Sequence, residues 1–225
     1  MNNFKSILKG ISVILIYFLA NIILQIPVSN ITDSPLFLKI IYSLASEITI
    51  LFLIVLLLKD DIRKNWADLS KNHKVYFDKY FKYWFLLIGV MMLSNYVINL
   101  FFAQAVASNQ QAINDMFDKA PIYTFFSAVF IAPITEELVF RLGIRKIIKN
   151  NLLFIFISGF IFGGLHVFIT MKSNVELLYL IPYCTPGFIF AYLLTKTDNV
   201  FVPTSIHFFH NGILLSIQFL ALLLG

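Results

Sequence analysis

Three ionisable residues, Glu136, Glu137 and Arg141, lie at the end of an apolar stretch that begins near residue 122. A charged side chain costs about 2.5–3.5 kcal/mol to place at the centre of a membrane helix, so such residues by default mark functional sites. Successive residues of an α-helix are separated by about 100°. Glu137 and Arg141 therefore share a helical face and can form an ion pair. Glu136 points elsewhere, which leaves its carboxylate free for proton transfer.

Two further apolar stretches carry histidines. Gly159 and Gly163 have the spacing that lets two membrane helices approach closely, and His166 lies on about the same face. His207 and Asn211 also share a helical face. Each pair alone is more often a packing or hydrogen-bonding group between helices than a catalyst.

Together, Glu136, His166, His207 and Asn211 supply a proton acceptor, a second proton-transfer group and two hydrogen-bond donors. These are the parts required to hydrolyse a carbonyl compound. They come from three separate stretches, so the hypothesis requires the corresponding helices to converge at one buried point. We expect a small, wet cavity there, opening towards the cytoplasmic half of the bilayer.

The elements that must position these residues are membrane helices. The chain has 225 residues, of which 59% are hydrophobic and 13% charged, whereas soluble domains have about 25% charged residues. Seven apolar stretches approach the roughly 20 residues needed to span a bilayer. They comprise residues 7–26, 36–58, 84–106, 122–140, 152–171, 177–195 and 200–224. We therefore predict an all-α, polytopic membrane helix bundle, with residues 1–225 forming a single membrane domain.

The basic residues predict the orientation of this bundle. With the N-terminus in the cytoplasm, only Lys39, Lys119 and Lys172 of the 17 Lys and Arg residues fall in outer segments. This asymmetry follows the positive-inside rule, so the net charge of +5 reflects topology and not nucleic-acid binding. We expect a multi-pass protein of the cell membrane. Residues 59–82 fit equally well a cytoplasmic segment lying along the lipid headgroups and a solvated loop, and residues 107–120 are expected to form an exposed outer loop.

Glu47 and Cys184 are the remaining candidates for chemistry. Glu47 lies inside the second stretch, and we expect a hydroxyl or a basic group of another helix to satisfy it, with a role at the site as the alternative. Cys184 is the only cysteine, so it forms no intramolecular disulfide. Its neighbours include no basic partner, which favours a buried packing role over a nucleophilic one.

Three patterns in the second half of the chain resemble the signatures of the CPBP intramembrane proteases, a family that includes CAAX prenyl proteases and the bacteriocin-processing or immunity proteins called Abi. EExxxR corresponds to Glu136–Arg141, FxxxH to Phe162–His166, and HxxxN to His207–Asn211. The three occur in the order of the family, and the resemblance covers about residues 122–215. The first three predicted spans carry no signature.

The resemblance implies a glutamate-dependent, metal-independent endopeptidase that requires no cofactor and acts on a membrane-associated peptide or protein in the bilayer. Glu136 and His166 would activate water, and His207 with Asn211 would stabilise the oxyanion. Glu137 and Arg141 would support the site structurally. Nothing in the sequence indicates a pocket for a prenyl group.

Three alternatives stay open. Glu136, His166 and His207 could form the ligand set of a zinc protease, although the sequence contains no HExxH motif. The chain could instead be a non-catalytic immunity or peptide-binding membrane protein. A proton-coupled transporter would also place carboxylates and histidines in the membrane, but we find no internal repeat that would favour one.

Overall fold

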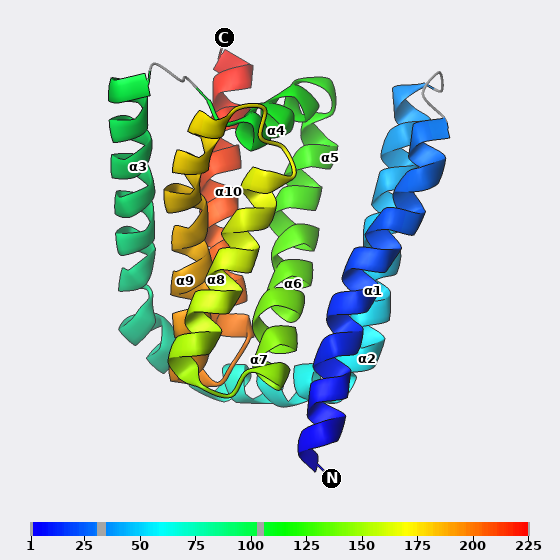
Figure 1. Ribbon diagram of the computed structural model, residues 1–225, viewed down its shortest axis with the longest axis vertical. Helices are drawn as coiled ribbons and strands as arrows, with labels where there is room; N and C mark the ends of the chain where they lie inside the picture. The colour runs from blue at the N-terminus through cyan, green and yellow to red at the C-terminus, as the bar shows by residue number, and fades with distance from the viewer. Residues whose placement is uncertain (1, 31–34, 103–105, 225) are drawn as a thin grey trace.

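The computed structural model describes residues 2–30, 35–102 and 106–224, and every regular element in these ranges is helical. Figure 1 shows the helices running roughly parallel to one another, with the two termini at opposite ends. In chain order the elements are α1 (Asn2–Asn30), α2 (Leu36–Tyr80), α3 (Lys82–Phe102), α4 (Ser108–Lys119), α5 (Pro121–Phe126), η1 (Ser127–Ile131), α6 (Ala132–Glu136), η2 (Glu137–Gly143), α7 (Ile144–Ile147), α8 (Asn151–Phe168), η3 (Asn174–Tyr179), α9 (Leu180–Thr197) and α10 (Phe201–Leu224). The elements η1 and η2 are π-helical, and η3 is a 3₁₀ helix.

The prediction of seven membrane-spanning helices is confirmed. Among the described residues, seven helical segments are long and apolar enough to cross a membrane. The fourth, Pro121–Ile147, extends beyond its predicted end and combines α5, η1, α6, η2 and α7. Residues 103–105, at the end of the predicted third span, lie outside the described residues. The prediction of an exposed loop at 107–120 is wrong, because most of this stretch forms the helix α4. The Phe117 side chain of α4 is buried against Val129 and Leu215.

The stretch 59–82 is almost entirely helical, which excludes a loop, whereas its position along the lipid headgroups stays a prediction. α2 continues without interruption to Tyr80, and Figure 1 shows its second part passing beneath the bundle towards α3. A buried polar clamp fixes it there. Asn199, in the turn between α9 and α10, donates to the Asn65 carbonyl (2.8 Å) and to the Asp68 carboxylate (2.7 Å). Asn65 in turn accepts a hydrogen bond from the Val200 amide (2.6 Å).

The segments predicted to be cytoplasmic meet at one end of the molecule. Asp61 of α2 pairs with Lys9 of α1 (2.9 Å) and with Lys146 of α7 (2.6 Å). Together with the Asn65–Asn199 clamp, these contacts bring three basic segments and the α9–α10 turn to the end that carries the N-terminus. The charge asymmetry of the sequence thus corresponds to a real asymmetry of the fold.

The close packing of α8 against its neighbour, predicted from Gly159 and Gly163, is confirmed, and the neighbour is α9. A Cβ atom added at Gly163 would lie 2.5 Å from the backbone nitrogen of Cys184, and one added at Gly187 would lie 2.6 Å from the Gly159 carbonyl oxygen. Only glycine permits backbones to approach this closely. Cys184 is buried in this contact, in agreement with its predicted packing role.

Candidate active site

A fully buried ion pair forms the base of the candidate site. The Glu137 and Arg141 side chains have 0% exposure, and Arg141 Nε lies 3.1 Å from Glu137 Oε2, an ion-pair distance without hydrogen-bond geometry. Arg141 also donates from Nη1 to Ser158 Oγ (3.2 Å) and stacks its guanidinium over the Phe162 ring at 4.5 Å. The pair predicted from helical spacing is therefore present, and α8 completes its surroundings.

The helix that carries this pair is not a regular α-helix, in contrast to the regular helix assumed from the sequence. The π-helical turn η2 begins at Glu137, directly after Glu136 ends α6. A second π-helical turn, η1, precedes Pro133. Single π-turns inside α-helices occur frequently at functional sites. Here η2 contains the ion pair, while Glu136 stays at its edge.

His207 of α10 lies between the two glutamates. Its Nδ1 is 3.1 Å from Glu137 Oε1, and its Nε2 is 3.8 Å from Glu136 Oε2. The first distance is a hydrogen bond and the second is longer than one. Because a carboxylate only accepts, the Glu137 contact places a proton on Nδ1 and directs Nε2 towards Glu136. The Glu136 side chain is 17% exposed, in contrast to the fully enclosed Glu137.

His166 of α8 lies further from Glu136. Its Nδ1 is 2.8 Å from the Phe162 carbonyl oxygen, an acceptor, so Nδ1 carries the proton and the neutral ring has a free acceptor at Nε2. The ring of Phe162 contacts both histidines, with centroid distances of 4.7 Å to His166 and 5.9 Å to His207. In the part of the chain that the structure describes, no hydrogen bond or ion pair connects His166 to Glu136.

Asn211 is directed to a neighbouring cavity. Its Nδ2 donates to the Ala128 carbonyl of η1 (2.8 Å), which commits one of its two amide hydrogens. Asn211 and Ala128 line a cavity of about 330 Å³ together with Gln110 and Leu214. Of the four predicted catalytic residues, the structure thus brings Glu136 and His207 together. The His166 and Asn211 side chains are instead hydrogen-bonded to the backbone carbonyls of Phe162 and Ala128.

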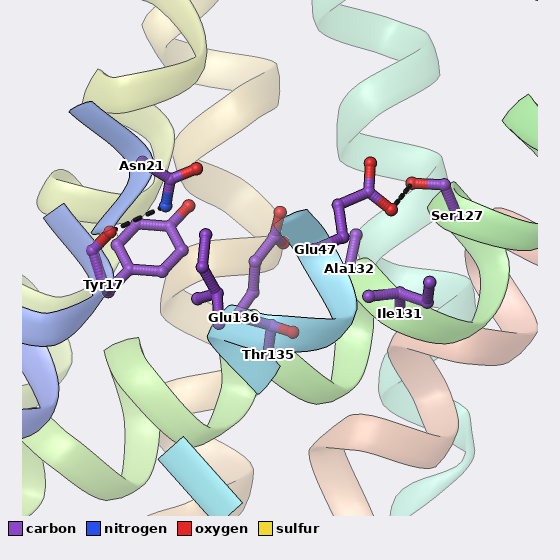
Figure 2. Close-up of a pocket in the computed structure, with 9 residues that line it drawn as sticks. Tyr17, Asn21, Glu47, Ser127, Ile131, Ala132, Thr135 and Glu136 are labelled. Carbon is purple, nitrogen blue, oxygen red and sulfur yellow. Dashed lines mark hydrogen bonds between the residues drawn. The ribbon is translucent and has the colours of Figure 1, made fainter. Parts of the chain in front are cut away.

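Glu136 opens into a cavity of about 140 Å³ between α1, α2 and the η1–α6 segment (Figure 2). Its lining residues are Tyr17, Asn21, Glu47, Ile50, Ser127, Ile131, Ala132, Thr135 and Glu136. An adjoining cavity of about 230 Å³ shares Asn21, Glu47 and Ile50 and adds Leu24, Ser43, Ser46 and Tyr123. The expected opening towards the cytoplasmic half of the bilayer stays a prediction.

Glu47 is satisfied by hydroxyl groups of another helix, as predicted. Its Oε1 accepts a hydrogen bond from the Tyr123 hydroxyl (2.6 Å), and its Oε2 accepts one from Ser127 Oγ (2.8 Å). A place beside the candidate site was the alternative to this hydrogen-bonded role. Glu47 has both, because it lines the same cavity as Glu136. Tyr17 was missed, since a tyrosine in an apolar span carries no signal of its own.

The residues proposed for a zinc site are not gathered as a ligand set. No group of three or more His, Cys, Asp and Glu side chains within residues 2–30, 35–102 and 106–224 has the arrangement needed to hold a metal ion. Glu136 and His207 are neighbours, and the ring of Phe162 contacts both His207 and His166.

Comparison with known proteins identifies the segment that carries the site. Residues 118–213 match the family described as type II CAAX prenyl endopeptidase Rce1-like. This segment contains all six predicted site residues, from Glu136 to Asn211. The helices α1 to α3, including the Tyr17 and Glu47 side of the cavity, precede it.

Several bacterial proteins resemble the chain over a similar region. YdiL of Bacillus subtilis, whose name assigns it provisionally to the membrane peptidases, is 31% identical over 50% of this chain and 43% of its own length. The membrane-embedded CAAX protease MroQ of Staphylococcus aureus is 28% identical over 60% of this chain and 55% of its own. The UPF0177 protein YvdC of Lactococcus lactis is 27% identical over 56% of this chain and 47% of its own. The chain thus spans about half the length of these relatives, and no solved structure matches it.

Proposed function

From the match of residues 118–213 to the Rce1-like family, we propose that the chain is an intramembrane endopeptidase of the CPBP family. Its seven spans make it a multi-pass protein of the cell membrane. The proposed reaction is hydrolysis of a peptide bond in a membrane-associated peptide or protein. The observation that carries the proposal is His207, held by buried Glu137 so that its Nε2 faces Glu136 at the edge of a cavity.

Glu136 is the proposed general base. It is the more exposed of the two glutamates, it lines the cavity, and the described residues give its carboxylate no hydrogen-bonded protein partner. A water in the cavity would transfer a proton to this carboxylate while its oxygen attacks the carbonyl carbon of the substrate. The same proton would then pass to the nitrogen of the leaving amine as the C–N bond breaks. The products are a carboxylic acid and an amine, which together contain all the atoms of the water, and no other reactant is required.

His207 and Asn211 are the proposed oxyanion donors. Donation from His207 Nε2 requires the doubly protonated ring, in which Nδ1 still donates to the Glu137 carboxylate 3.1 Å away. Asn211 retains one amide hydrogen beyond its bond to Ala128. His166, whose Nε2 is an acceptor, would assist Glu136 in activating water. Glu137 and Arg141 would position His207 without contacting the substrate.

The decisive variant is Glu136→Gln, which keeps the shape of the side chain and removes its basicity. We expect it to abolish turnover, and His166→Ala to do the same, while Asn211→Ala leaves a trace of activity because one oxyanion donor contributes about 100- to 1000-fold in rate. The measurement is mass spectrometry of membrane-associated peptides from cells that express the intact chain or a variant. Normal processing by Glu136→Gln would exclude the mechanism.

Two controls separate the remaining alternatives. A binding or immunity protein would keep its cellular effect in the Glu136→Gln variant, whereas a peptidase would lose it. Dialysis of the purified protein against a strong chelator, followed by metal analysis and an activity assay, tests the zinc alternative. We expect activity to persist after chelation.

A further inference from the structure

The cavity beside Glu136 has a lining that the hydrolytic step does not use. It brings a second carboxylate, Glu47 of α2, to the same space as Glu136 of α6. Figure 2 shows both side chains reaching this space from opposite helices, with Ser127 bonded to Glu47. Neither this cavity nor the adjoining one is lined by a described Lys, Arg or His. The lining therefore offers two negative groups and no positive one.

Glu47 is oriented but not saturated. Each of its oxygens accepts one hydrogen bond, from Tyr123 and from Ser127. A carboxylate has about four acceptor positions, so these two bonds fix its direction and leave acceptor capacity for a ligand. Asn21 adds an amide whose Nδ2 is committed to the Tyr17 carbonyl (2.7 Å), which leaves the amide oxygen as its uncommitted acceptor.

An independent observation also indicates a ligand. Thr135 lines the cavity, its exposure is only 7%, and its Oγ1 has no hydrogen-bond partner among the described atoms. Buried hydroxyl groups in proteins are nearly always paired. An unpaired one next to two carboxylates is a hydrogen-bonding position that a polar group from outside the chain can fill.

From this combination we propose that the cavity binds a cationic nitrogen of the substrate, either a lysine or arginine side chain or a free amino terminus, next to the bond that is cleaved. The proposal rests on the proposed peptidase function, because it places the cation in the cavity into which Glu136 opens. A cationic group provides the donors that the lining lacks and neutralises carboxylates that are costly to keep ionised within a bilayer. The volume of about 140 Å³ accommodates such a group, since one water occupies about 30 Å³ in the liquid.

The first test measures specificity. The full chain, reconstituted in lipid vesicles, is given membrane-anchored peptides that differ at one position near the cleaved bond, with lysine, arginine or the uncharged isostere norleucine. A matched set with free or acetylated amino termini distinguishes the two sources of the cation. We expect the intact chain to prefer a cationic peptide, and Glu47→Gln to reduce the ratio of its kcat/KM to that of the neutral peptide by about tenfold. Thr135→Val should shift the ratio in the same direction.

Glu176→Gln is the matched control. Glu176 is also a buried glutamate, but it holds Ser108 at the outer end of the bundle and lines neither cavity beside Glu136. We expect it to leave the preference for cationic peptides unchanged. If the intact chain cleaves cationic and neutral peptides equally, or if Glu47→Gln slows both by the same factor, Glu47 has only a structural role and the inference is overturned.

A binding measurement makes this test independent of catalysis. Dodecylamine and dodecanol differ in the charge of one small head group, and each is titrated against the intact chain and Glu47→Gln while thermal unfolding is recorded. We expect dodecylamine alone to raise the unfolding temperature, and Glu47→Gln to remove that effect. Glu47-dependent amine binding without peptide cleavage would retain the cation site and refute the peptidase proposal. Peptide cleavage with no effect of dodecylamine and no preference for cationic peptides would retain the peptidase proposal and refute the cation site.

Discussion

Two adjacent glutamates have opposite environments, and this difference determines what each can do. Glu137 is fully enclosed and contacts Arg141 and His207, whereas Glu136 is partly exposed at a cavity. A buried charge is tolerated only when its partners are present. These environments support the proposal that Glu137 positions His207 while Glu136 exchanges a proton.

We expect Glu137→Gln to lower the free energy of unfolding by about 3–5 kcal/mol, because it leaves the Arg141 charge buried without its counter-ion. Glu136→Gln should change stability much less, since its carboxylate is partly exposed and the ion pair of buried Arg141 is with Glu137. Chemical unfolding of the detergent-solubilised protein measures both values. The double variant Glu137→Leu with Arg141→Met should recover most of the lost stability. Equal losses in the two single glutamine variants would contradict the assigned difference.

Helix packing connects these residues into a site. α8 supplies Ser158 and Phe162 to the ion pair, and its own position is fixed by the glycine contact with α9. The π-turns η1 and η2 lie immediately before and after α6, where they change the directions in which the side chains of the fourth span point. The site thus depends on two helices that contain none of the glutamates.

The α8–α9 contact predicts a contrast between two glycines. We expect Gly163→Ala to destabilise the protein by about 1–3 kcal/mol, because the new methyl group would overlap the backbone of Cys184. Gly89→Ala in α3 is the control, since a Cβ atom there meets nothing within 4 Å. It should stabilise the helix by roughly 0.5–1 kcal/mol. Unfolding measurements on the two variants should therefore show effects of opposite sign.

At the scale of the whole molecule, the basic segments gather at one end. The Asp61 contacts and the Asn65–Asn199 clamp hold α1, α2, α7 and α10 together at the basic end. At the other end, Figure 1 shows α1 and α2 standing apart from α5. The basic end is the one that the charge asymmetry predicts to face the cytoplasm.

Cysteine labelling can test this orientation. Cys184 is buried, so a membrane-impermeant thiol reagent should react weakly with the unmodified chain. Ser70→Cys and Ser173→Cys introduce the same conservative change at exposed positions on opposite ends of the bundle. In intact cells we expect the reagent to label Ser173→Cys and not Ser70→Cys, and to label both after the membrane is permeabilised. The reverse labelling pattern would show that the N-terminus lies outside the cytoplasm, which contradicts the predicted topology.

The sequence by itself determined the membrane class, the seven spans, the Glu137–Arg141 pair and the tight glycine face of α8. These properties depend on local spacing and composition, which the amino-acid order specifies directly. Only the tertiary structure decided that His207 is the neighbour of both glutamates, that Asn211 lines a different cavity, and that Glu47 and Tyr17 line the cavity of Glu136. Those relationships depend on how each helix is rotated and tilted against the others. The π-turns and the packing of distant segments set these angles, which helical periodicity alone does not predict.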